Sequence, residues 1–241
     1  MTPPTPATAS GASRPALQER FVHLLALGLD PSWRRRPADQ RRAEIQGLLD
    51  AEAALAAAGC GALTYSSIGL EPGIDLLVWR SAAEVDLLEA AAARWLRSGV
   101  GAWLEVRQAF LARTGTSQYV ARPSPQELAL LEGERSRYLI AYPFVKSTEW
   151  YLLSREARQG VMNEHMRVGR GFPMVRQLLG YSFGLDDQDF LVVYETDDLS
   201  AFGELVHALR ATEARRSTVR DTPILLGRLR PLEEILHLLG D

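Results

Sequence analysis

The residue with the most suggestive chemical surroundings in this sequence is a single histidine. The chain has four histidines, namely His23, His165, His207 and His237. Three of them are expected to be structural or exposed, because they lie in a strand-like run or in exposed helical segments. His165 instead lies near the end of a predicted helix, on an apolar face, where the negative end of the helix dipole favours a bound cation. A packed core histidine is the usual explanation for such a residue. The neighbouring side chains therefore decide between a packed histidine and a metal ligand.

The side chains around His165 favour an iron-containing anionic ring over a bare metal ion. No second histidine lies at metal-ligand spacing and Cys60 is the only cysteine, which argues against zinc or iron held by several protein ligands. A porphyrin supplies four nitrogen ligands itself, so its iron needs only one ligand from the protein. Arg167 and Arg170 can pair with carboxylates, whereas methionines such as Met162 and nearby aromatic residues suit the ring. The sequence therefore predicts an iron porphyrin whose metal is bound by His165.

The elements that would position these residues belong to an internal repeat. Residues 65–92 match residues 180–207 at one constant offset, with Ser67-Ile68-Gly69-Leu70 corresponding to Ser182-Phe183-Gly184-Leu185. Each unit reads as strand, polar turn, strand and helix. With a strand and a helix before it and a strand after it, each half follows the order β-α-β-β-α-β of a ferredoxin-like fold. Two such sheets bury their open faces and edges best against each other. The predicted class is α+β, with two ferredoxin-like repeats side by side as a dimeric α+β barrel within one chain.

The boundaries follow from composition and periodicity. We expect a disordered tail at 1–16, an N-terminal repeat without cofactor at 17–113, a linker at 114–134 and a C-terminal haem-binding repeat at 135–241. The helix at 37–58 is expected to bury a stripe of Ile45, Leu48, Leu49 and Ala53, with Glu52 interrupting it. Other expected elements are strands at 21–27, 102–111, 137–144 and 224–226 and helices at 154–168, from about 83 and from about 199.

The composition narrows the class of protein. Of 241 residues, 46% are hydrophobic and 24% are charged, and the net charge is -3, which is typical of a soluble globular protein. No basic stripe indicates a nucleic-acid or membrane partner. No apolar stretch approaches the roughly 20 residues of a membrane span, and the start lacks the apolar core of a secretory signal. We therefore expect a cytoplasmic protein.

The second half also contains an ordered series of motifs. They are Tyr142-Pro143-Phe144-Val145-Lys146, then Trp150-Tyr151-Leu152-Leu153, then Glu164-His165 with Gly169-Arg170, then Tyr181-Ser182-Phe183-Gly184-Leu185-Asp186-Asp187. This series resembles the chlorite dismutase superfamily, and within it the coproheme decarboxylases. The doubled fold is also that of the superfamily, so the resemblance extends over about residues 17–238.

The resemblance implies roles for several of these residues. His165 takes the place of the proximal haem ligand, and Lys146 that of a lysine in contact with a porphyrin propionate. Tyr142 matches the redox-active tyrosine of the decarboxylases, a phenol that can lose an electron and a proton to oxidised iron. The resulting radical attacks the Cβ–H of a propionate, whose carboxyl group is lost as carbon dioxide and whose two remaining carbons become a vinyl group on the ring. Trp150 and Tyr151 are implied to pack beside the ring.

One position separates the activities of the family. The residue seven before Gly184 faces the distal side of the haem, and it is arginine in chlorite-decomposing members and glutamine in the decarboxylases; here it is Gln177. A guanidinium can hold a departing hypochlorite anion, whereas a neutral amide cannot. A register shift of one residue would place Arg176 there instead.

Further arginines are implicated by the same resemblance. Arg170 and Arg210 match arginines near the propionates, although both can equally be ordinary surface residues. Arg215 stands where some decarboxylases have a propionate-binding serine. Glu213 is a candidate to accept a hydrogen bond from the proximal histidine.

Together these residues predict a peroxide-dependent coproheme decarboxylase, which converts iron coproporphyrin III to haem b through two oxidative decarboxylations. The first alternative is a chlorite dismutase or weak haem peroxidase of the same family. The second is a non-catalytic haem-binding or structural protein. The resemblance further implies a homo-oligomer, usually a pentamer, and a possible ferrochelatase partner that delivers the substrate.

Overall fold

The computed structural model describes residues 19–115, 119 and 134–240. Most of the predicted linker, like the predicted N-terminal tail, lies outside the described residues. The N-terminal repeat consists of β1 (Phe21–Leu29), η1 (Pro31–Arg35), α1 (Ala38–Ala57), β2 (Leu63–Glu71), β3 (Ile74–Ala82), α2 (Val85–Leu96), η2 (Gly99–Trp103) and β4 (Leu104–Arg113). The C-terminal repeat consists of β5 (Tyr138–Lys146), α4 (Thr148–Leu152), α5 (Arg155–Gly169), β6 (Arg176–Tyr181), β7 (Phe190–Thr196), α6 (Leu199–Arg210), η3 (Glu213–Ser217), β8 (Thr218–Arg220), β9 (Leu225–Leu229) and α7 (Leu232–Gly240).

The strands form one antiparallel sheet that closes on itself. The order is β7-β6-β4-β1-β3-β2-β9-β5-β8, and β7 also pairs with β5, which completes a ring. Within the ring, β4-β1-β3-β2 and β6-β7-β5-β9 are the two ferredoxin-like sheets, joined where β2 pairs with β9 and where β4 pairs with β6. The predicted α+β barrel of two ferredoxin-like repeats is confirmed. Closure matters because it leaves no long open edge in the ring.

The barrel interior is packed with apolar side chains from both repeats. Alternate residues of a strand point to opposite faces of a sheet, and one set from each strand meets in the interior. Gly227 on β9 is required there, because a Cβ on it would lie 2.6 Å from the Cβ of Tyr65 on β2. The interior is therefore a filled core and not a binding site.

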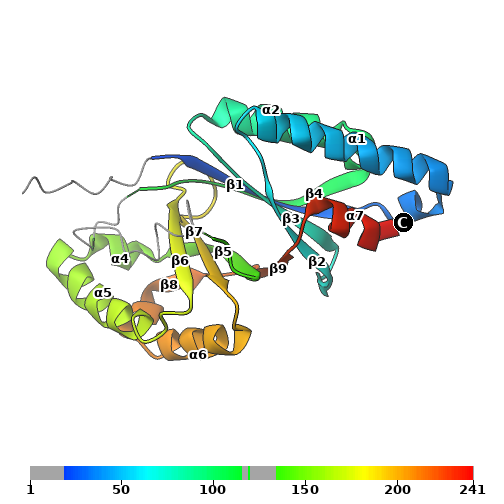
Figure 1. The fold of residues 1–241 in the computed structure, drawn as a ribbon. Coiled ribbons are helices and arrows are strands. Elements are labelled where there is room, and N and C mark those ends of the chain that lie inside the picture. The colour runs from blue at the N-terminus through cyan, green and yellow to red at the C-terminus, as the bar shows by residue number, and fades with distance from the viewer. Residues whose placement is uncertain (1–18, 116–118, 120–133, 241) are drawn as a thin grey trace, which may run out of the picture.

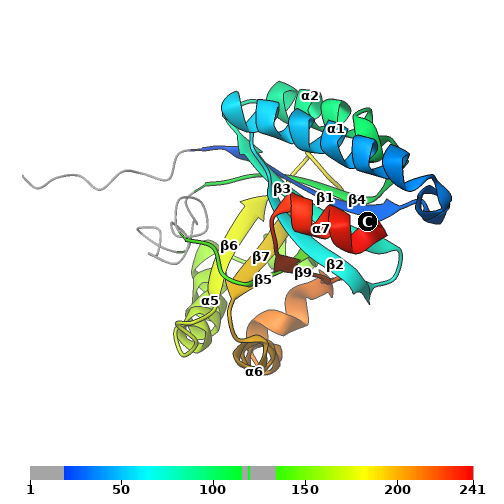
Figure 2. The same ribbon diagram turned by 45° about the vertical axis from the view of Figure 1, so that its right-hand side comes forward.

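The helices of the two repeats cover opposite sides of this barrel, as both views show (Figure 1, Figure 2). On the N-terminal side, α1 and α2 pack on the sheet, and the C-terminal helix α7 joins them. Trp33, Trp95, Ile235 and Leu236 are fully or almost fully buried there and belong to one large cluster. The layer between helices and sheet is thus filled by side chains in the N-terminal repeat.

One sequence expectation for α1 is wrong in detail. Ile45 and Leu48 are buried as expected and Leu49 is half-buried, but Ala53 is exposed and Ala51 is buried instead. The reason is Glu52, whose carboxylate accepts hydrogen bonds from Trp95 Nε1 at 2.6 Å and Arg80 Nη2 at 2.5 Å. The acid is turned toward the interior by these donors, which rotates the buried face of the helix.

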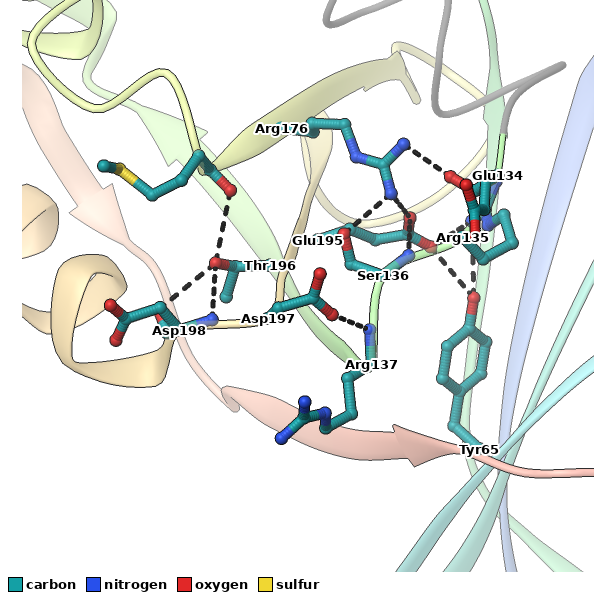
Figure 3. A network of polar contacts seen from close by, with 11 residues as sticks. Tyr65, Glu134, Arg135, Ser136, Arg137, Arg176, Glu195, Thr196, Asp197 and Asp198 are labelled. Carbon is teal, nitrogen blue, oxygen red and sulfur yellow. Dashed lines mark hydrogen bonds and ion pairs between the residues drawn. The ribbon is translucent and has the colours of Figure 1, made fainter.

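A polar network fastens the two repeats to each other (Figure 3). Its centre is Glu195 on β7, whose side chain is fully buried. Tyr65 of β2 donates a hydrogen bond of 3.0 Å to Glu195 Oε1, Arg176 lies 3.2 Å from Oε2, and Arg135 pairs with the same carboxylate. A buried carboxylate is tolerated because its charge is paired and hydrogen-bonded.

None of the helices among the described residues is both long and apolar enough to cross a membrane.

Candidate functional site

The C-terminal repeat contains a cavity where the N-terminal repeat has packed side chains. Its volume is about 1010 Å³, including the space at its open mouth. One wall of the cavity is α5. This 15-residue helix has no buried residue, so its side chains do not fill the space between the helix and the sheet. Only a small apolar cluster fills the layer between α6 and the sheet. A void of this size beneath a half-buried helix face is typical of a ligand site.

The floor of the cavity comes from alternate residues of three adjacent strands. Tyr142 of β5, Gln177 and Leu179 of β6, and Val192 and Tyr194 of β7 line it. In the ladders, Gln177 is directly opposite Tyr194, and Tyr142 is opposite Val192. The pleat therefore aims all five side chains at the same space.

The two phenols on this floor interact with each other. Their ring centroids are 6.2 Å apart, and Tyr142 and Tyr194 share a side-chain hydrogen bond. Burial, followed by the neighbouring Tyr194, raises the pKa of Tyr142 far above its ordinary value. Burial also raises the pKa of Tyr194, to about 12. Both therefore remain protonated phenols at neutral pH.

His165 projects from α5 into the same cavity. Its Nδ1 atom is buried without a hydrogen-bond partner in the described part of the chain. Burial, and then the charge of Lys146, lower the pKa of His165 to about 4, while Glu164 acts in the opposite direction. The imidazole is therefore neutral at pH 7 and keeps a lone pair available for a metal.

A single neutral imidazole is the donor set that a porphyrin iron requires. Within the ranges that the structure describes, no group of three or more His, Cys, Asp or Glu side chains is arranged to hold a metal ion. An iron bound at His165 therefore needs its remaining ligands from another source, which a porphyrin provides. The orphaned imidazole and the largely apolar cavity fit that group.

The cavity carries positive charge in and beside η3. Lys146, Arg210 and Arg215 line it, and Asp221 is the one acid among the described lining residues. Lys146 donates from Nζ to the Ala214 carbonyl at 2.9 Å. Burial, and then the charge of Arg215, lower the pKa of Lys146 to about 8. The cavity is thus suited to an anionic ligand.

Most of the residues singled out in the sequence come together here. Eight of them line the cavity, namely Tyr142, Lys146, Trp150, Met162, His165, Gln177, Arg210 and Arg215. Trp150 is buried, with its ring 4.5 Å from Lys146 Nζ. Tyr151 and Arg170 are not brought to the cavity. Tyr151 packs edge-on against Phe183 at 6.0 Å, and Arg170 is exposed at the end of α5.

The structure also separates Gln177 from its neighbour on β6. Gln177 faces the cavity, whereas Arg176 points to the opposite face, where it bonds to Ser136 at 2.7 Å and pairs with Glu195. The Glu213 carboxylate pairs with Arg216 at 3.3 Å, so the expected hydrogen bond from His165 to Glu213 is not formed.

Sequence reasoning missed two features of the site. Tyr194 follows Val192 at strand spacing, and this alternation was the signal that both share the cavity face. The ion pair of Arg215 with Asp221, at 2.5 Å, joins residues across η3 and β8. No helix or strand period relates these two positions, so the sequence carried no comparable signal for the pair.

The closed double sheet and the one-histidine cavity define a class, the α+β barrels of two ferredoxin-like repeats with a single ligand site. The chain belongs to the chlorite dismutase family, whose family model matches residues 39–230. It is 30% identical over 174 residues to the coproheme decarboxylase of Mycolicibacterium smegmatis, which covers 71% of this chain and 74% of that protein.

Two chlorite dismutases are also similar to this chain. The enzyme of Ideonella dechloratans is 28% identical over 167 residues, which is 66% of this chain and 57% of that protein. The structure of chlorite dismutase from Candidatus Nitrospira defluvii in complex with imidazole superposes with a TM-score of 0.83 at 26% identity, covering 92% of this chain and 95% of that one. The relatives therefore include both activities of the family.

Proposed function

We propose that this protein is a coproheme decarboxylase, which converts iron coproporphyrin III to haem b by peroxide-dependent oxidative decarboxylation of two propionates. The observation that carries the proposal is the grouping of Tyr142, Lys146, His165 and Gln177 around one cationic cavity. The likeness to a protein named coproheme decarboxylase supports it. The neutral Gln177 on the floor, in place of a guanidinium, favours it over chlorite decomposition.

The cavity residues divide the tasks of binding. His165 would hold the iron through its neutral imidazole, while Lys146 and Arg210 would pair with carboxylates of the substrate. Trp150 and Met162 would pack against the ring. The iron, when bound, would supply the redox chemistry through which hydrogen peroxide acts as the oxidant. Lys146 is half-buried in a largely apolar cavity, and a cation in such a place interacts with carboxylates more strongly than a cation in water.

Tyr142 would carry the oxidation to the propionate. Its phenol is protonated and faces the cavity, so the electron and the proton have to leave together. The radical that remains can take a hydrogen atom from the propionate Cβ, which restores the phenol. Loss of a second electron and of carbon dioxide then leaves the vinyl group. Each decarboxylation releases two electrons, and one molecule of peroxide accepts them as it is reduced to water.

The test is a mass measurement on the product. Purified protein mixed with iron coproporphyrin III and hydrogen peroxide should yield a porphyrin that has lost two carboxyl groups. Tyr142→Phe should stop the loss while leaving substrate binding nearly intact, and Tyr138→Phe, on the same strand but outside the cavity, is the matched control. Oxygen release from chlorite with an unchanged porphyrin would instead identify a chlorite dismutase. Binding without turnover in either assay would identify a haem-binding protein.

The remaining expectations belong to the same proposal. By resemblance we propose a homo-oligomer, a pentamer, that acts in the cytoplasm. A ferrochelatase would deliver the substrate, since the chemistry requires iron to be inserted into coproporphyrin before decarboxylation. Sedimentation of the purified protein measures the oligomer size.

A further inference from the structure

An ion pair between Arg215 and Asp221 lies in the wall of the cavity. Arg215 lies in η3 and Asp221 directly after β8, and both line the cavity. Arg215 Nη1 is 2.5 Å from Asp221 Oδ2, and the two side chains are 39% and 24% exposed. Solvent therefore reaches this pair, and a solvent-reached ion pair contributes little to stability. The pair can open without disturbing the fold.

Among the described residues that line the cavity, positive charges outnumber negative ones. Lys146 has a backbone carbonyl, that of Ala214, as its hydrogen-bond acceptor, and the charge of Arg215 contributes to the lowered pKa of the Lys146 amine. Arg210 adds a third cation to the lining. Against these stands one described acid, Asp221. An added carboxylate would relieve the repulsion among the cations.

We propose that Arg215 is a carboxylate-binding residue whose charge Asp221 neutralises until a substrate carboxylate displaces it. The inference rests on the proposed function and extends it to substrate choice. An arginine can hold a carboxylate through two parallel hydrogen bonds, and the exchange replaces one carboxylate by another at the same guanidinium. A tetracarboxylate porphyrin reaches this position with one carboxylate while others pair with Lys146 and Arg210.

The incoming carboxylate would share its cavity with the proposed reactive phenol. Asp221 and Tyr142 both line the cavity, and the charge of Asp221 contributes to the raised pKa of the Tyr142 phenol. A substrate carboxylate that takes over the contact with Arg215 therefore enters the same cavity as this phenol. Arg215 is thus a positioning residue for a propionate, in addition to a determinant of selectivity.

The test uses metal-free porphyrins, so that binding is measured without turnover. Coproporphyrin III, with four carboxylates, and protoporphyrin IX, with two, are titrated into the full-length protein while porphyrin fluorescence is followed. Arg215→Gln should weaken coproporphyrin binding about tenfold, the loss of one charge-assisted contact, and change protoporphyrin binding less than about twofold. Asp221→Asn should strengthen coproporphyrin binding, because the internal competitor is gone. Arg215→Lys should retain part of the affinity.

Arg216→Gln is the matched control. It removes the same charge from the adjacent position, where the side chain is 81% exposed and pairs with Glu213, and it should leave both affinities unchanged. Equal affinities of wild type and Arg215→Gln for coproporphyrin would overturn the inference, and so would weaker binding in Asp221→Asn, which would show that Asp221 holds Arg215 in place for another purpose. If the wild type binds neither porphyrin, the proposed function fails as well. Suppose instead that the wild type binds coproporphyrin and decarboxylates iron coproporphyrin III, and that Arg215→Gln binds coproporphyrin equally well. In that case only this inference fails.

Discussion

Replacing His165 by glutamine should make the protein without porphyrin less sensitive to acid. In the folded chain the imidazole is buried, its Nδ1 atom has no hydrogen-bond partner among the described residues, and the charge of Lys146 is near. Protonation of this ring in the folded state is therefore costly, and its pKa falls from 6.5 to about 4. The unfolded chain has no such cost and takes up the proton near pH 6.5.

The magnitude follows from that difference in pKa. Between pH 6.5 and 4 the unfolded state binds more protons than the folded state, so the free energy of unfolding falls as the pH is lowered through this window. At pH 5 the contribution of His165 amounts to about 2 kcal/mol, and it is absent above pH 7.5. Glutamine does not titrate and removes this contribution while keeping a polar side chain of similar length.

Urea unfolding of the wild type and of His165→Gln at pH 7.5, 6 and 5 measures the effect. The difference between the two proteins should change by about 2 kcal/mol in favour of the variant between pH 7.5 and 5. His207→Gln, on the exposed face of α6, controls for the loss of a histidine as such. The wild type keeps some acid sensitivity from other groups, among them His23, whose pKa burial also lowers. Parallel pH profiles of wild type and His165→Gln would refute the neutral, unpartnered imidazole on which the proposed iron site depends.

Three further outcomes test other parts of the structure. Glu195→Ala should lower the free energy of unfolding by roughly 3 kcal/mol, because two arginines lose their buried partner; an unchanged urea midpoint would contradict the role of the network. Gly227→Ala should lower the free energy of unfolding by about 1–3 kcal/mol through overpacking against Tyr65, measured as a lower Tm. An unchanged Tm would show that the barrel interior accommodates the added methyl group. Coproporphyrin binding should weaken as the pH rises through about 8, where Lys146 loses its charge, and Lys146→Gln should flatten that profile; equal slopes would exclude a role for this amine.

The internal repeat made the architecture predictable. Once residues 65–92 were matched to 180–207, the strand order within each half followed from the ferredoxin-like pattern, and closure followed from the need to bury two open sheets. The two seams were not predictable, because β2 meets β9 and β4 meets β6 across long sequence separations. Nor was the placement of α7 against the N-terminal repeat. Such contacts depend on tertiary packing, which leaves no local period in the sequence.

The structure differs from the sequence predictions mainly at charged residues. Glu52 interrupts the apolar stripe of α1 in the sequence, yet its carboxylate is turned inward by Trp95 and Arg80. Arg176 and Gln177 were hard to separate because a shift of one residue reverses the face of a strand. The pairing of Arg176 with Glu195 accounts for its direction, and the partner lies on another strand. A pattern of apolar positions does not specify where a buried charge finds its counter-charge.

The contrast between the two repeats explains why one of them has a cavity. In the N-terminal repeat, Trp33, Trp95 and the apolar face of α7 fill the layer between helices and sheet. In the C-terminal repeat, α5 contributes no buried residue, and the corresponding space remains open. A planar apolar ring in that space would bury the inner face of α5, as the tryptophans and α7 bury the inner faces of α1 and α2. Burying apolar area stabilises the fold. Ligand binding would then complete the core of the C-terminal repeat, and the free energy of binding would add directly to its stability.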